Sequence, residues 1–160
     1  MPQGQVFLVV GHENWGKSRT LKAMTDGNVH AKEVRIGSKS FFIRRMSNDD
    51  RPEEWVQFVD TLDPTEKPHV ILTVCPRKEA LPVLRKLTES YDLFFWVIRH
   101  RHNEGIQITI EEEKSLRALG TVEVYDQRRE ASDRAAAFKQ FIRAHLEPMK
   151  QTQAMSKDNL

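Results

Sequence analysis

Cysteine is almost absent from this chain: Cys75 is its single cysteine, so the chain can form no disulfide within itself. Long hydrophobic runs are missing as well. The longest, residues 93–98, is far shorter than the roughly 20 residues that a membrane-spanning helix needs. The first residues lack the basic region and the apolar stretch of a signal peptide. From these three absences we expect a cytoplasmic protein with no membrane partner.

The chain also lacks an excess of charge of either sign. Its 25 lysines and arginines nearly balance 23 aspartates and glutamates, so no overall field indicates a nucleic-acid partner. Hydrophobic residues make up 39% of the 160 residues and charged residues 30%, which is typical of a globular domain with a well-solvated surface. We expect one domain over residues 1–146 and a disordered tail over 147–160, where large apolar residues are few.

Short apolar runs alternate along the chain with segments of helical periodicity. We expect strands at residues 6–10, 33–36, 40–44, 70–74, 93–98, 106–110 and 121–125, and helices at 17–24, 51–62, 80–91, 111–119 and 133–146. Repeated strand–helix–strand units predict an α/β fold, a three-layer αβα sandwich with a mainly parallel sheet of about five strands. Since such sheets bind ligands at the carboxyl ends of their strands, the loops after residues 10, 74, 98 and 125 should surround one site.

One motif carries specific chemistry: residues 11–18 read GHENWGKS and match G-x-x-x-x-G-K-[ST]. Gly11 and Gly16 allow a tight turn in which successive backbone N–H groups point at phosphate oxygens. Lys17 supplies a positive charge for the β- and γ-phosphates, and Ser18 a hydroxyl for Mg²⁺. The helix expected to begin here turns the positive end of its dipole toward the anion.

This motif, between a buried strand and a helix, resembles that of the P-loop NTPase superfamily. The resemblance covers the first strand, loop and helix, and implies a P-loop fold that binds a nucleoside triphosphate with Mg²⁺. Carried over to this sequence, the nucleotide-binding residues are Gly11, Asn14, Trp15, Gly16, Lys17, Ser18 and Arg19, with Ser18 also at the metal. The guanine-binding signature N-K-x-D is absent from the chain, so ATP is a better prediction than GTP.

The chain departs from that family at the position of the magnesium-holding acid. P-loop hydrolases resemble one another in an acidic residue at the end of a buried strand, whereas residues 70–74 run into Cys75, which we interpret as a small buried hydrophobe. The nearest acids are Asp49 and Asp50, beyond the strand at 40–44. They would hold a magnesium-bound water or activate an acceptor; alternatively, they form a polar turn that caps the next helix.

A second resemblance is one of layout. Small kinases of the adenylate or shikimate kinase type place arginines in a lid between their fourth and fifth parallel strands, and the corresponding interval here contains Arg99 and Arg101. The resemblance implies that these arginines stabilise the charge of phosphoryl transfer, with Lys17, Asp49 and Asp50 as the other catalytic residues. The alternative is a solvated basic loop.

Two classes of function remain open at this point. The first is an NTP-dependent phosphotransferase or NTPase, with an acceptor that the sequence does not identify. The second is a nucleotide-dependent switch or interaction module with little intrinsic hydrolysis, working in a larger assembly. In that case an exposed Trp15 and the loop at 99–105 would contact a protein partner, and a partner could also supply an arginine in trans.

Overall fold

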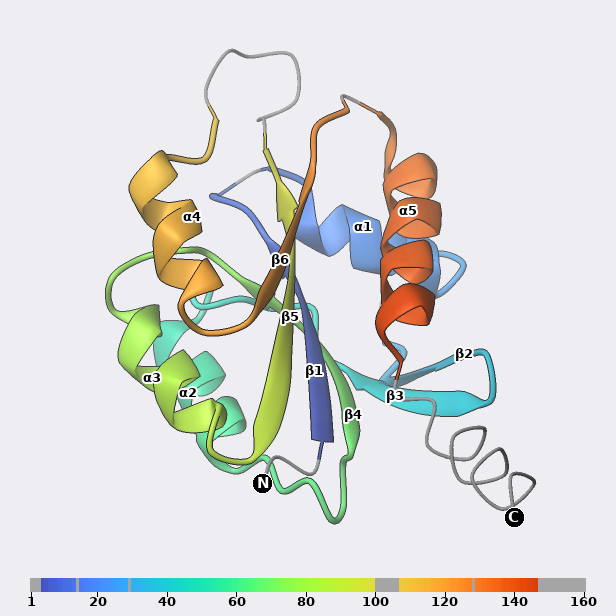
Figure 1. Ribbon diagram of the computed structural model, residues 1–160. Coiled ribbons are helices and arrows are strands. Elements are labelled where there is room, and N and C mark those ends of the chain that lie inside the picture. Colours follow the sequence, from blue (N-terminus) through green and yellow to red (C-terminus); the bar gives the residue numbers. More distant parts are fainter. Residues whose placement is uncertain (1–3, 14, 29, 100–106, 128, 147–160) are drawn as a thin grey trace, which may run out of the picture.

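The computed structural model describes residues 4–13, 15–28, 30–99, 107–127 and 129–146, and these form an α/β structure (Figure 1). The elements in chain order are β1 (Gly4–Val10), α1 (Lys17–Met24), β2 (Glu33–Ile36), β3 (Lys39–Ile43), α2 (Pro52–Asp60), β4 (His69–Val74), α3 (Ala80–Leu87), β5 (Tyr91–Ile98), α4 (Ile110–Arg117), β6 (Thr121–Tyr125) and α5 (Ala131–His145).

The sheet has the strand order β2-β3-β4-β1-β5-β6. β1 pairs in parallel with both β4 and β5, β3 pairs in parallel with β4, and β6 with β5. Only β2 is antiparallel to its neighbour β3 among the described strand pairs. The predicted mainly parallel sheet is therefore confirmed, with six strands in place of about five. Since the chain crosses to opposite sides of β1, the carboxyl end of β1 is the point of this sheet where ligands are expected to bind.

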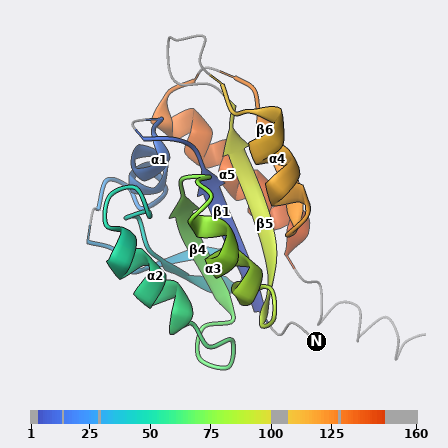
Figure 2. The ribbon, with the colours of Figure 1, turned by 90° about the vertical axis from the view of Figure 1, so that its left-hand side faces the viewer.

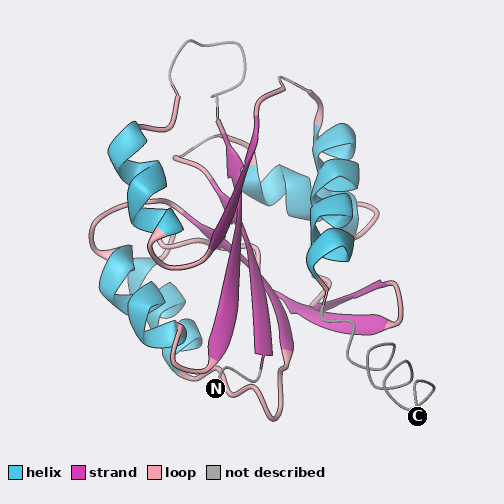
Figure 3. Cartoon of the chain, in the orientation of Figure 1, coloured by secondary structure: helices cyan, strands magenta, loops and turns pink. Residues whose placement is uncertain are grey.

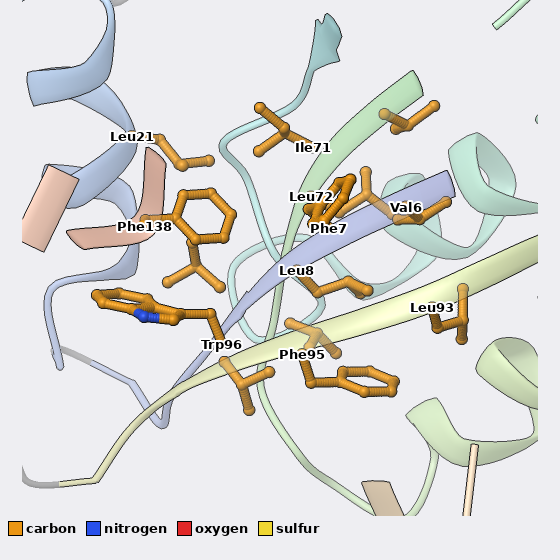
Figure 4. Close-up of a cluster of buried hydrophobic side chains, with 14 of the residues drawn as sticks. Val6, Phe7, Leu8, Leu21, Ile71, Leu72, Leu93, Phe95, Trp96 and Phe138 are labelled. Atoms are coloured by element: carbon orange, nitrogen blue, oxygen red, sulfur yellow. The ribbon is translucent and has the colours of Figure 1, made fainter. Parts of the chain in front are cut away.

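Helices cover both faces of the sheet, an arrangement compatible with a three-layer sandwich. Helices α1 and α5 lie on one face, and α2, α3 and α4 lie on the other (Figures 2 and 3). All seven residues of β1 are buried, as expected of a strand covered on both sides. On the α5 face the ring of Phe138 packs 5.4 Å from that of Trp96, with Leu21 of α1 in the same cluster (Figure 4). Aromatic packing thus holds α5 against the sheet.

The structure corrects the prediction of a strand at residues 106–110. The Ile108 N–H still donates to the Arg99 carbonyl at 2.9 Å, as in a strand, but the described residues form no longer strand here and Ile110 is already the first residue of α4. The reason is a capping box: the Thr109 hydroxyl accepts a hydrogen bond from the Glu112 N–H at 3.1 Å, and the Glu112 carboxylate accepts one from the Thr109 N–H at 2.9 Å. These side-chain bonds favour the start of a helix over an extended strand.

The helix predicted at residues 80–91 is also too long. It ends at Leu87, and Tyr91 is the first residue of β5. Tyr91 is buried and its hydroxyl donates to the Lys67 carbonyl at 2.7 Å, so tertiary contacts override the helical spacing here. The bounds of the other elements agree with the prediction to within two residues, and those of α1, β2 and β6 coincide with it. The predicted tail at 147–160 lies outside the described residues.

No helix in the described ranges combines the length and the apolar character needed to cross a membrane.

Candidate functional site

The chain leaves the end of β1 at Gly11 and reaches the start of α1 through Trp15 and Gly16. The Gly11 N–H donates to the Val74 carbonyl at 3.2 Å, which fastens the start of this loop to β4. Gly16 then adopts φ 96°, a left-handed conformation that glycine enters at little cost. Helix α1 begins at Lys17 without a side-chain cap, so its first N–H groups remain suited to an external acceptor such as a phosphate.

Lys17 and Asp49 form an ion pair at the carboxyl edge of the sheet. The Lys17 ammonium lies 3.5 Å from Asp49 Oδ2, and their side chains are only 6% and 3% exposed. Lys17 also donates to the His12 carbonyl at 3.0 Å. The other carboxylate oxygen, Asp49 Oδ1, is buried and has no hydrogen-bond partner among the described residues. A buried carboxylate oxygen without a donor is costly, and a donor or a cation would relieve that cost.

The loop after β3 holds Asp49 in this place. Asn48 lies buried directly before it and binds the backbone of Cys75 with both ends of its amide, at 2.7 and 3.0 Å. Asp50 has a different role: its carboxylate accepts a hydrogen bond from the Ser47 N–H at 3.4 Å. Of the two predicted acids, Asp49 thus contacts Lys17, whereas Asp50 makes a hydrogen bond within the polar turn after β3.

A cavity of about 560 Å³ opens beside this pair, between α1, the loop after β3 and the start of α5. Its walls carry both charge signs, with cations in excess near α1 and α5. The lining residues are Glu13, Trp15, Gly16, Lys17, Ser18, Arg19, Arg45, Asp49, Asp50, Arg129, Glu130, Ala131 and Arg134. The cavity therefore brings together the predicted residues Trp15 to Arg19 with both predicted acids.

The structure also places residues that the sequence analysis missed in this cavity. The chief one is Arg134 of α5, which is only 8% exposed and donates to Thr20 Oγ1 at 2.8 Å and to the Arg129 carbonyl at 2.6 Å. Burial lowers the pKa of this guanidinium; the nearby Tyr125 opposes that shift, and Arg19 adds to it. One signal was present: Arg134 lies on the helical stripe of Phe138, Phe141 and Ile142, where a charged residue is unusual.

A chain of side-chain contacts connects His12, in the loop after β1, to α4 and to the end of β4. His12 Nε2 lies 2.7 Å from Glu112 Oε2 at the start of α4, and His12 Nδ1 lies 3.6 Å from Cys75 Sγ after β4. Burial raises the pKa of the Cys75 thiol, which keeps it protonated at neutral pH. The thiol is fully buried, in agreement with its interpretation as a small hydrophobe.

Trp15 lines the cavity as a buried side chain, whereas the remaining predicted residues lie apart from the cavity or outside the described chain. Trp15 is 4% exposed and packs edge-on against the His12 ring, so the expectation of an exposed partner surface at Trp15 was wrong. Arg99 does not line the cavity; its Nε lies 3.3 Å from Asp126 Oδ1. Gly11 lies buried at the end of β1. Asn14 and Arg101 fall outside the described residues.

The donor set of the site suits a hard cation that keeps some of its water. No group of three or more histidines, cysteines or acids that could hold a metal ion occurs within the described ranges. Asp49 and Ser18 both line the cavity. One carboxylate and one hydroxyl match the few protein ligands that Mg²⁺ takes when phosphate oxygens and water complete its shell.

Comparisons of the chain with protein-family models, with curated proteins and with solved structures found no match.

Proposed function

We propose that this cavity binds a nucleoside triphosphate together with Mg²⁺, and that the protein is a P-loop phosphotransferase or NTPase. The observation that carries the proposal is the buried Lys17–Asp49 pair, with an unpartnered carboxylate oxygen, at the uncapped start of α1. These groups come from distant parts of the chain. They supply the cation, the N–H groups and the carboxylate that a triphosphate–magnesium complex requires.

In this proposal each residue has a separate task. Lys17 can make three hydrogen bonds, and since its partners here are the His12 carbonyl and Asp49, it retains donor capacity for a phosphate oxygen. The N–H groups at the start of α1 bind further phosphate oxygens. Ser18 and Asp49 would hold Mg²⁺, directly or through its water. When bound, Mg²⁺ bridges phosphate oxygens and neutralises the charge that develops on them.

The nucleotide in this proposal is ATP, and the absence of N-K-x-D argues for it over GTP. The acceptor is undefined, so the proposal covers transfer to a small molecule as well as to water. Arg45 lines the same cavity as Asp49 and Asp50 and is a further cation at the acidic end of the cavity.

A variant of Asp49 tests the magnesium part of the proposal. Asp49→Asn keeps the shape of the side chain but removes its charge, so it should abolish most of the gain in ATP affinity that Mg²⁺ gives to the wild type. Asp60→Asn, at the end of α2 and exposed, serves as the control and should behave as the wild type. Calorimetric titration with and without Mg²⁺ measures both. An undiminished magnesium effect in Asp49→Asn would refute the role of Asp49.

A second candidate function, a nucleotide-dependent switch with little hydrolysis, is favoured by the contact between His12 and Glu112. This contact ties the loop that would hold the phosphates to the first turn of α4. Phosphate binding that moves the loop would therefore act on α4 directly. Turnover of ATP by the purified protein distinguishes the two: catalytic turnover with an acceptor supports the enzyme, and tight binding without turnover supports the switch.

A further inference from the structure

Arg134 packs against the backbone of the loop that precedes α1. Its Nη2 lies 3.4 Å from the Gly16 carbonyl, in addition to its bonds to Thr20 and to the Arg129 carbonyl. A Cβ atom at Gly16 would lie 2.7 Å from Nη2 of Arg134. Gly16 is therefore favoured for its left-handed φ, and a side chain at this position would also displace the end of Arg134.

This contact fixes the direction of one peptide group in the loop. The Gly16 carbonyl also accepts from the Thr20 N–H at 3.0 Å and from the Thr20 hydroxyl at 2.8 Å. In a trans peptide the C=O and the following N–H point in opposite directions, so these bonds turn the Lys17 N–H away from α5. Arg134 thus acts on the first N–H of α1, one of the groups that an anion at this helix start would use.

The charge of Arg134 is uncompensated, unlike that of Lys17. Its hydrogen-bond partners are two backbone carbonyls and a hydroxyl, and no carboxylate in the described part of the chain forms an ion pair with it. Arg134 lines the same cavity as Lys17, together with Arg19 and Arg129. A buried cation is costly without an anion, and a phosphate group in the cavity would supply one.

We propose that Arg134 is a positioning residue for phosphate binding. It orients the Gly16–Lys17 peptide through the three hydrogen bonds of its guanidinium group and adds a buried positive charge. Binding of an anionic phosphate ligand and docking of α5 against the loop then stabilise each other. This inference rests on the proposed function, because it takes the cavity to be the phosphate site.

Three variants of α5 test it by titration with Mg-ATP and, separately, with inorganic pyrophosphate. Arg134→Gln keeps a polar side chain but loses the charge and the several N–H donors of the guanidinium. The Kd for both ligands should therefore rise by about 10-fold or more. Arg134→Lys keeps the charge but not the planar guanidinium, and should raise the Kd by a smaller factor, about 3-fold or more. Arg143→Gln, an exposed arginine on the same helix, should leave the Kd within about 2-fold of wild type.

The outcomes separate this inference from the proposed function. A folded Arg134→Gln protein that binds both ligands as tightly as the wild type would overturn the positioning role alone. The same conclusion would follow if only the melting temperature of the free protein fell. Should Arg134→Gln not fold, wild-type affinity in Arg134→Lys would overturn it. A wild type that binds neither ligand would overturn the proposed function, and this inference with it.

Discussion

The side-chain amide of Asn48 makes two hydrogen bonds to the backbone of Cys75, accepting from its N–H at 2.7 Å and donating to its carbonyl at 3.0 Å. Both residues are buried. This pair fastens the loop after β3 to the end of β4, and the residue that follows Asn48 is Asp49, whose carboxylate reaches Lys17. The position of the acid in the cavity therefore depends on an amide that does not line it.

Asn48→Ala should for this reason weaken both the fold and the site. It leaves the buried N–H and carbonyl of Cys75 without these partners, which costs about 2–3 kcal/mol of unfolding free energy. Loss of the anchor also frees Asp49, so the magnesium-dependent part of ATP binding should decrease. Urea unfolding and calorimetry measure the two effects. Asn28→Ala, on an exposed loop, is the control; magnesium dependence equal to wild type in Asn48→Ala would argue against this anchoring.

Tyr91 should make the free energy of unfolding decrease at alkaline pH. Burial raises the pKa of its hydroxyl from 10.0 to about 12. Because the folded state disfavours the phenolate, the contribution of protonated Tyr91 to the free energy of unfolding is fully present below pH 10. It is lost as the pH rises from about 10 to about 12. Urea unfolding at pH 8, 10 and 11 should show a steeper decrease for the wild type than for Tyr91→Phe, in which this group cannot ionise. Parallel decreases would contradict the assignment.

The two predicted lid arginines are best tested as a pair. If Arg99 and Arg101 act on the transferred phosphate, the double variant Arg99→Ala with Arg101→Ala should turn over more slowly while its Kd for ATP changes little. Arg99 pairs with Asp126 and does not line the cavity, so a movement of this segment would have to bring it to the phosphates. Turnover equal to that of the wild type would leave the alternative, a solvated basic loop.

Sequence patterns predicted those parts of the fold whose conformation follows from the hydrophobic pattern of neighbouring residues. Continuous apolar runs located the buried strands β1, β4 and β5, and alternation of strands and helices predicted their parallel pairing. Prediction failed at Tyr91 and at Ile110, where hydrogen bonds to residues distant or near in the sequence decide the conformation. The hydroxyl of Tyr91 needs the Lys67 carbonyl, and Thr109 needs Glu112.

The candidate site could be predicted only in part. The spacing of Gly11, Gly16, Lys17 and Ser18 predicts a phosphate-binding loop, since such a site on consecutive residues leaves a local signature, and the phosphate itself stays a prediction. Asp49 and Asp50 were equivalent in sequence, and only the packing of Asn48 brings the first of them to Lys17. Arg134 was missed because its partners Gly16 and Thr20 lie at the other end of the chain.

The central claim is that the cavity at Lys17 binds a nucleoside triphosphate with Mg²⁺. It is tested most directly by calorimetric titration of ATP and GTP, with and without Mg²⁺, into the wild type, Lys17→Ala and the control Lys22→Ala. Lys22 lies exposed on the same helix, α1. The account predicts magnesium-dependent binding, stronger for ATP, that Lys17→Ala abolishes and Lys22→Ala preserves, with all three proteins folded. ATP binding by Lys17→Ala as tight as that of the wild type would contradict it.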